Sequence, residues 1–278
     1  LRARLARATG RPDDDPLLLD LLYGTGAAAD SRVAGALFRA LLSLRVCDPA
    51  AGCGALLLGM AHELERLLTL LGRGQPAETC PASPAALRRH IASSALYGLD
   101  IDAGAIEVTR WRLILFVMAA PGAPAPDAAL AAAVGEHFQV GDGLEPPPEP
   151  APVQLDLFDA DADRPASPAA AEGVSPWRCR FPEVFSGPSP GFDVVVSNPP
   201  YVRQELLDPA YKAGAQRACR ALLPCETRLD GKSDLYAHFY HLGLGLLREG
   251  GSLCVIAYNS WLDTGFGAGV RALLLRHS

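Results

Sequence analysis

The chain contains 278 residues, of which 49% are hydrophobic and 20% are charged, and its formal net charge is −6. This length and apolar content predict a folded protein with one large or two small domains. The acidic balance excludes a protein that coats nucleic acid through its overall charge. No run reaches the roughly 18 consecutive apolar residues of a membrane span, so we expect no membrane partner.

Seven cysteines occur, and none forms a Cys-x-x-Cys pair. This favours reduced thiols over a disulfide framework or a zinc site, so we expect a cytosolic protein without a bound metal. No secretory signal is recognisable at the start of the chain. Residue 1 is leucine and residues 270–278 have a helical pattern, so we expect a piece of a longer polypeptide.

Apolar periodicity predicts helices and short strands that alternate from residue 44 onward, after an N-terminal helical segment at 1–30. The expected helices cover 31–42, 55–71, 85–94, 103–117 and 235–247; the expected strands cover 44–47, 96–99, 138–140, 192–197 and 252–257, the last after a turn at Gly250-Gly251. This alternation predicts an α/β fold over 31–278: a Rossmann-like, mostly parallel, doubly wound sheet with helices on both faces. Ligands bind such sheets at the carboxyl ends of the strands.

One segment departs from this alternation. Residues 143–176 are rich in Pro, Ala and Asp and poor in apolar side chains, which predicts a flexible insertion. It contains a sequence similar to the short peptide by which bacterial proteins dock on the replication sliding clamp: Gln154, Leu155, Asp156, Leu157 and Phe158. An apolar pair in a polar loop favours a partner's pocket, and packing of the pair on its own domain is the alternative.

A glycine turn follows the first predicted strand, with the sequence Asp48-Pro49-Ala50-Ala51-Gly52-Cys53-Gly54. Its glycines allow a tight turn and a close approach of a ligand to the backbone. The turn lacks the third glycine of a dinucleotide fingerprint, where Leu57 stands, and the lysine of a phosphate loop. An acid at its mouth suits a positively charged ligand such as S-adenosylmethionine, and an ordinary strand-to-helix turn is the alternative.

Acidic residues also follow the second and third predicted strands. Asp100 is a candidate acceptor for both hydroxyls of a ribose, while Asp102 is expected to cap the next helix. Asp142 is a candidate acceptor for the amino group of a cofactor's adenine. The alternatives are two capping acids and a plain Asp-Gly turn.

The most specific motif is Asn198-Pro199-Pro200-Tyr201, which follows the fourth strand and its continuous run Val194-Val195-Val196. Consecutive prolines fix an extended backbone and remove two amide donors. The Asn198 side-chain oxygen and the Pro199 carbonyl remain as acceptors, which fits an amino group with two hydrogens. These hydrogen bonds strengthen as the attacked nitrogen becomes tetrahedral. Tyr201 offers a face for stacking a planar base, and a proline-rich turn is the alternative.

Together these motifs resemble the S-adenosylmethionine-dependent, gamma-type adenine-N6 DNA methyltransferases of restriction-modification and phage-defence systems. The resemblance runs from about residue 31 to the end and includes Phe181-Pro182-Glu183-Val184-Phe185, Lys232-Ser233-Asp234-Leu235-Tyr236 and Asn259-Ser260-Trp261-Leu262. It implies a seven-stranded sheet and methyl transfer to a flipped-out adenine of double-stranded DNA in the bacterial cytoplasm. It implies catalytic roles for Asn198, Pro199, Pro200 and Tyr201, and cofactor contacts from Asp48, Ala50, Gly52, Gly54, Asp100, Ile101 and Asp142.

Some features depart from the family pattern or stay open. Ala51 and Cys53 replace the family's Cys and Ser or Thr, and the usual Tyr-Thr-Pro element is not recognisable. The last two strands and the region that reads bases are expected outside the chain. Asp234 is either a pocket residue or a helix cap, and Trp261 either borders the pocket or belongs to the core. The alternative functions are a protein-glutamine or RNA methyltransferase and a non-catalytic DNA-binding subunit.

Overall fold

The computed structural model of the chain describes residues 5–6, 9–10, 12, 15–23, 31–73, 75–76, 80–146, 175–227 and 229–277. The chain divides into two compact units, each built from separate stretches of sequence. Unit 1 comprises Leu1–Gly143, Gly191–Pro199 and Leu246–Ala257, and unit 2 comprises Leu144–Pro190, Pro200–Gly245 and Tyr258–Ser278.

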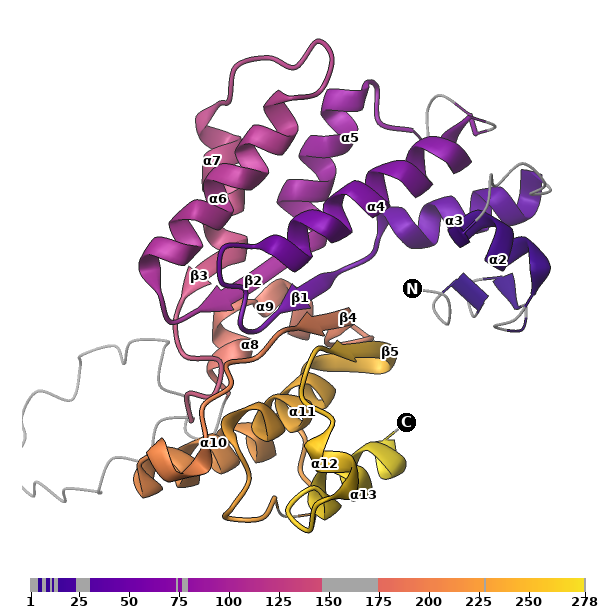
Figure 1. Cartoon of the computed structure of the whole chain (residues 1–278). Helices are drawn as coiled ribbons and strands as arrows, with labels where there is room; N and C mark the ends of the chain where they lie inside the picture. Colours follow the sequence, from indigo (N-terminus) through magenta and orange to yellow (C-terminus); the bar gives the residue numbers. More distant parts are fainter. Residues whose placement is uncertain are drawn as a thin grey trace, which may run out of the picture. The chain divides into compact units, whose positions relative to one another are not determined.

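Unit 1 contains a sheet of five parallel strands in the order β3-β2-β1-β4-β5 (Figure 1). The strands are β1 (Val46–Asp48), β2 (Leu96–Asp100), β3 (Phe138–Val140), β4 (Phe192–Ser197) and β5 (Leu247–Val255). The central strand is β1, whose Cys47 pairs with Tyr97 of β2 and with Val195 of β4. The order of the strands reverses between β1 and β4, and doubly wound sheets bind their ligands at such a switch point.

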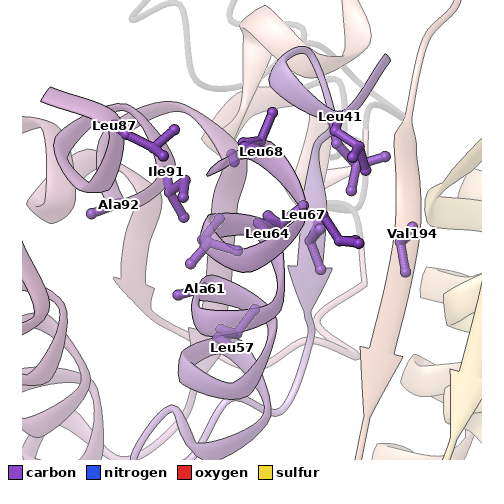
Figure 2. Packing of buried hydrophobic residues seen from close by; sticks show 14 of the residues in the cluster. Leu41, Leu57, Ala61, Leu64, Leu67, Leu68, Leu87, Ile91, Ala92 and Val194 are labelled. Carbon is purple, nitrogen blue, oxygen red and sulfur yellow. The ribbon is translucent and has the colours of Figure 1, made fainter. Parts of the chain in front are cut away.

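Helices flank this sheet. They are α2 (Pro16–Tyr23), α3 (Ser31–Leu42), α4 (Ala55–Gly72), α5 (Pro84–His90), α6 (Ala103–Met118) and α7 (Ala128–His137), with a π-helical turn, η2 (Ile91–Ala95), before β2. The buried leucines of α4 recur at helical spacing, from Leu57 through Leu64 to Leu71. They join one apolar cluster with side chains from α3, α5, η2 and β4 (Figure 2). Each fully buried leucine contributes about 1.5–3 kcal/mol, so packing of this stripe holds α4 in place.

Unit 2 is helical in its described residues. Its elements are α8 (Pro176–Arg180), α9 (Pro182–Phe185), the 3-10 turn η3 (Gln204–Leu206), α10 (Pro209–Leu222), α11 (Leu235–Leu246, whose last residue belongs to unit 1), α12 (Ser260–Asp263) and α13 (Ala268–His277). The Asp208 carboxylate caps α10 by accepting from the amides of Ala210 and Tyr211. The α11 side chains His238 and His241 are both buried.

The α/β class, the parallel sheet and its flanking helices are confirmed, and the bounds expected for β3, β4 and α3 match. The turn expected at Gly250-Gly251 is wrong, because β5 already begins at Leu247. Gly250 lies inside the strand with a φ of 71°, and the register with β4 shifts there. A glycine at positive φ therefore makes an irregularity within a continuous strand.

Two further details of the helices differ from the expectation. The single helix expected at 85–94 is α5 followed by the π-helical turn η2. Helices α7 and α10 were not predicted. The resemblance implied seven strands with the last two outside the chain, and the described residues contain five. Within these residues no helix has both the length and the apolar character to cross a membrane.

Candidate functional site

The predicted cofactor residues of unit 1 lie along one edge of the sheet. Asp48 ends β1, Asp100 ends β2, and Asp142 follows β3 at the same edge, because the three strands are parallel neighbours. The Gly141 amide donates to the Asp100 carbonyl, 2.8 Å away, which ties the end of β3 to that of β2. Asn198 comes directly after β4, the neighbour of β1 on its other side. The sequence-predicted residues of unit 1 thus gather at the carboxyl ends of four adjacent strands.

The glycine turn, residues 48–54, is held in a tight conformation. Gly52 and Gly54 have φ values of 50° and 73°, a region that side chains rarely adopt. A Cβ at Gly54 would lie 2.7 Å from the Thr109 methyl group, so no side chain fits there. A Cβ at Gly52 would meet nothing within 4 Å. Backbone conformation therefore requires both glycines, while the space beside Gly52 is open to a ligand.

Asp100 links the glycine turn to the end of β2. Its Oδ2 accepts a hydrogen bond of 2.7 Å from the Gly52 amide, and its Oδ1 accepts one of 2.9 Å from the Asp102 amide. Each carboxylate oxygen keeps further acceptor capacity. The Asp102 carboxylate accepts from the Gly104 and Ala105 amides, which confirms that it caps α6.

The amides of the glycine turn are already bonded within the protein. Those of Ala50, Ala51 and Gly52 donate to Asp48 Oδ1 (3.0 Å), the Leu99 carbonyl (2.9 Å) and Asp100 Oδ2 (2.7 Å). A phosphate-binding loop needs amides that point at the ligand. This turn instead combines bonded amides with two carboxylates, which suits a ligand with hydroxyl groups and positive charge.

Asp48 is the electrostatic centre of this edge. Its side chain is 2% exposed, and burial raises the pKa of its carboxyl to about 7, with a smaller contribution from the charge of Asp100. The Ala50 amide and the Ser197 hydroxyl lower this pKa. The buried Ser197 hydroxyl makes no hydrogen bond of regular geometry within the described residues, so we attribute its effect to a nearby dipole. A bound cation would favour the ionised carboxylate.

The remaining predicted residues of unit 1 flank the two carboxylates. Ala50 and Asp142 are half-buried, and Ile101 is 75% exposed directly after β2. The Ser197 carbonyl accepts from the Ile256 amide, and Asn198 is exposed just beyond this contact. Since prolines follow Asn198, no amide is present there to continue the strand pairing.

Pro200 and Tyr201 belong to unit 2, where Tyr201 faces another tyrosine. Its ring centroid lies 4.6 Å from that of Tyr258, with an angle of 53° between the planes, and both side chains are exposed. The neighbouring helix α12 contacts α11 through the Tyr236 and Ser260 hydroxyls, 3.2 Å apart. The aromatic pair is thus placed beside helices that pack on each other.

The structure describes the surroundings of both side chains of unit 2 whose roles were left open, Asp234 and Trp261. The Asp234 carboxylate accepts from the Gln204 amide at 2.8 Å instead of capping α11. Trp261 is half-buried and packs on Tyr240, with ring centroids 5.3 Å apart. Over the part of the chain that the structure describes, no group of three or more His, Cys, Asp or Glu side chains is arranged to hold a metal ion. The sequence similar to a clamp-docking peptide, at 154–158, lies outside the described residues.

Two residues at the turn were missed from sequence. The Thr109 hydroxyl donates to the Gly52 carbonyl at 2.9 Å, and Arg112 Nη1 donates to the Cys53 carbonyl at 2.7 Å. A signal for Thr109 exists in the sequence, since it shares helical spacing with the buried Ile106 and Leu113. A polar residue on an apolar helix face needs a partner.

Comparison with known proteins gives three kinds of match. The family model described as Eco57I restriction-modification methylase matches residues 94–278. The Type II methyltransferase M.XhoI of Xanthomonas vasicola is 37% identical over 107 residues, which are 38% of this chain and 18% of that protein. The adenine-specific methyltransferase PglX of Streptomyces coelicolor is 31% identical over 161 residues, which are 57% of this chain and 12% of that protein.

Among solved structures, the Type IIL restriction-modification enzyme MmeI, determined in complex with DNA, has a similar fold. The TM-score is 0.51 at 17% identity, and the match covers 94% of this chain and 31% of MmeI. The chain therefore spans less than a third of the length of each of these three proteins.

Proposed function

The chain belongs to the Eco57I restriction-modification methylase family, and on this premise we propose that it transfers a methyl group from S-adenosylmethionine to the N6 amino group of an adenine in DNA. The observation that carries the proposal is the pair of carboxylates, Asp48 and Asp100, at the glycine turn beside the end of β4. The name of PglX, an adenine-specific methyltransferase, and the DNA complex of MmeI support the choice of substrate.

The residues at the sheet edge fit S-adenosylmethionine. Its ammonium and sulfonium groups carry positive charge, which a buried Asp48 with a pKa of about 7 would receive as a carboxylate. Asp100 keeps acceptor capacity for the two ribose hydroxyls. The exposed Ile101 offers apolar surface for an adenine ring, and Asp142 a carboxylate for its amino group.

The reaction requires little chemistry from the protein itself. The cofactor supplies an electrophilic methyl group on its sulfonium. In our proposal the Asn198 side-chain oxygen and the Pro199 carbonyl accept the two hydrogens of the target amino group, orient its lone pair and stabilise the positive charge that develops on nitrogen. The bound cofactor would supply the methyl group by direct displacement, with the C–S electron pair left on the neutral sulfur, and the methylated nitrogen would then lose one proton to water.

Tyr201 provides the face on which an unpaired adenine would stack. The target amino group is inaccessible inside a duplex, so the base must leave the helix. Stacking on an aromatic ring contributes about 1–3 kcal/mol per base. The ring of Tyr201 is 43% exposed beside Tyr258, and this exposure supports such a contact. DNA in the bacterial cytoplasm is the proposed substrate, and docking on a sliding clamp through 154–158 stays a prediction.

The proposal is tested by labelled methyl transfer from S-adenosylmethionine to genomic DNA, with the full-length protein and sequencing of modified bases. We expect N6-methyladenine from the wild-type protein. Asn198→Ala should eliminate transfer while cofactor binding persists, and Thr69→Ala, at an exposed position of α4 outside every motif, is the control. Label on cytosine, on RNA or on protein glutamine would refute adenine specificity. No cofactor binding would indicate a non-catalytic subunit.

A further inference from the structure

Two side chains of α6 bind consecutive carbonyls of the glycine turn. Thr109, 1% exposed, donates to the Gly52 carbonyl, and the half-buried Arg112 donates to the Cys53 carbonyl. Both residues come more than 50 positions after the turn, so these contacts are tertiary and not part of the turn itself. The two residues are three positions apart on α6, so they lie on the same face of the helix and both reach the glycine turn.

Gly52 is bonded on both sides of its backbone. Its carbonyl accepts from Thr109, and its amide donates to Asp100 Oδ2 at 2.7 Å. Gly52 adopts a positive φ, and because glycine has no side chain, steric contacts do not fix this conformation. The bond from Thr109 fixes the direction of the carbonyl and restrains the rotation of the residue. The same restraint keeps the amide directed at the Asp100 carboxylate.

Thr109 also fills the space beside Gly54. Its Cγ2 and Oγ1 would lie 2.7 and 2.8 Å from a Cβ at that glycine, so the side chain packs directly on the turn. Gly54 in turn starts α4 in the left-handed conformation. One threonine thus contacts both glycines that the turn needs.

From these contacts we infer that Thr109 and Arg112 are positioning residues for cofactor binding: α6 holds the glycine turn, and the turn holds the Asp100 carboxylate for the ribose. The inference rests on the proposed function, because the ribose acceptor is assigned by it. Thr109 does not touch the cofactor in this scheme and acts through Gly52 and Asp100.

A double-mutant cycle tests this relay in the full-length protein. The variants are Thr109→Val, Asp100→Asn and the double variant, with S-adenosylmethionine affinity measured by calorimetry. Loss of one hydrogen bond is worth about 1 kcal/mol, so Thr109→Val should weaken affinity about fivefold, raising KM at nearly unchanged kcat. Because both residues act on one carboxylate, the double variant should bind within about twofold of Asp100→Asn. Additive losses, or wild-type affinity in Thr109→Val, would overturn the inference.

Controls separate positioning from stability. Thr109→Ser keeps the hydroxyl and should bind within about twofold of wild type, and Thr69→Val removes an exposed hydroxyl of α4 and should have no effect. Arg112→Met provides a second variant at a half-buried position, in case Thr109→Val does not fold; it too should weaken affinity about fivefold.

A ligand-free measurement keeps the inference distinct from the proposed function. Amide hydrogen exchange over residues 48–54 should accelerate in Thr109→Val and Arg112→Met but not in Thr109→Ser, because the Gly52 amide loses its restraint. Unchanged exchange in both variants would refute the positioning of the turn. Absence of cofactor binding by the wild-type protein would instead refute the proposed function and leave the exchange result to decide the positioning.

Discussion

The affinity for S-adenosylmethionine should depend on pH through Asp48. Its carboxyl has a pKa of about 7 in the folded protein, mainly because it is buried. A cationic ligand binds the ionised carboxylate, so the apparent affinity follows the ionised fraction. That fraction is roughly 0.9 at pH 8 and roughly 0.1 at pH 6 for such a group. We therefore expect the dissociation constant to rise about tenfold as the pH falls from 8 to 6.

Isothermal titration of the full-length protein at several values of pH would measure this dependence. The ligand's own ammonium group loses its proton at about pH 8. This loss of positive charge weakens binding as the pH rises, opposite to the effect of Asp48, and its contribution must be subtracted. Asp48→Asn supplies that correction, since it keeps the ligand's titration and removes that of the protein. Asp102→Asn, a variant of the exposed cap of α6, should retain the wild-type dependence. Parallel curves for wild type and Asp48→Asn would refute the reasoning.

Three further predictions concern stability. Asp48→Asn should raise the unfolding free energy of the ligand-free protein by up to about 4 kcal/mol at pH 8 and by little at pH 4, as measured by denaturant titration. The reason is that the raised pKa of Asp48 lowers the stability of the wild-type protein as the pH rises from about 4 through 7. Equal gains at both pH values would contradict this. Gly54→Ala, at φ 73°, should lower the unfolding free energy by about 1–3 kcal/mol, whereas Gly59→Ala in α4, with open space around it, should not lower it. Asp193→Ala should cost about 3–5 kcal/mol, because it leaves Arg248, whose Nε lies 2.6 Å from the buried carboxylate, without this partner; a loss below about 1 kcal/mol would show that the pair is dispensable.

Local patterns predicted the sheet where they were unambiguous. The strand Phe192–Ser197 is buried along its whole length, and its continuous run Val194-Val195-Val196 is typical of a sheet covered on both faces. Helix α7 was missed because alanines dominate it, and only Leu130 and Val134 of it are buried. A pattern of two buried residues is too short for a periodicity to be recognised. Glycines at 250–251 indicated a turn, and only the pairing with β4 shows them inside a strand.

The candidate site shows the same division between local and tertiary information. The strand-end positions of Asp48, Asp100 and Asn198 followed from the alternation of strands and helices, because parallel strands bring their carboxyl ends to one edge. The contacts that hold the turn did not follow, since Thr109 reaches Gly52 across 57 residues. The pKa of Asp48 likewise depends on burial that no local pattern specifies.

The negative charge of this protein is concentrated in one segment of the chain. Six of the 31 acidic residues but only one of the 25 basic residues lie in the segment 147–174, so the rest of the chain has a net charge of −1. An average over the chain therefore assigns to the whole protein an acidity that belongs mostly to one segment. Phosphate contacts depend on the local arrangement of basic residues rather than on the total. The acidic balance excludes a uniformly basic protein, but it has no weight against the proposed DNA substrate.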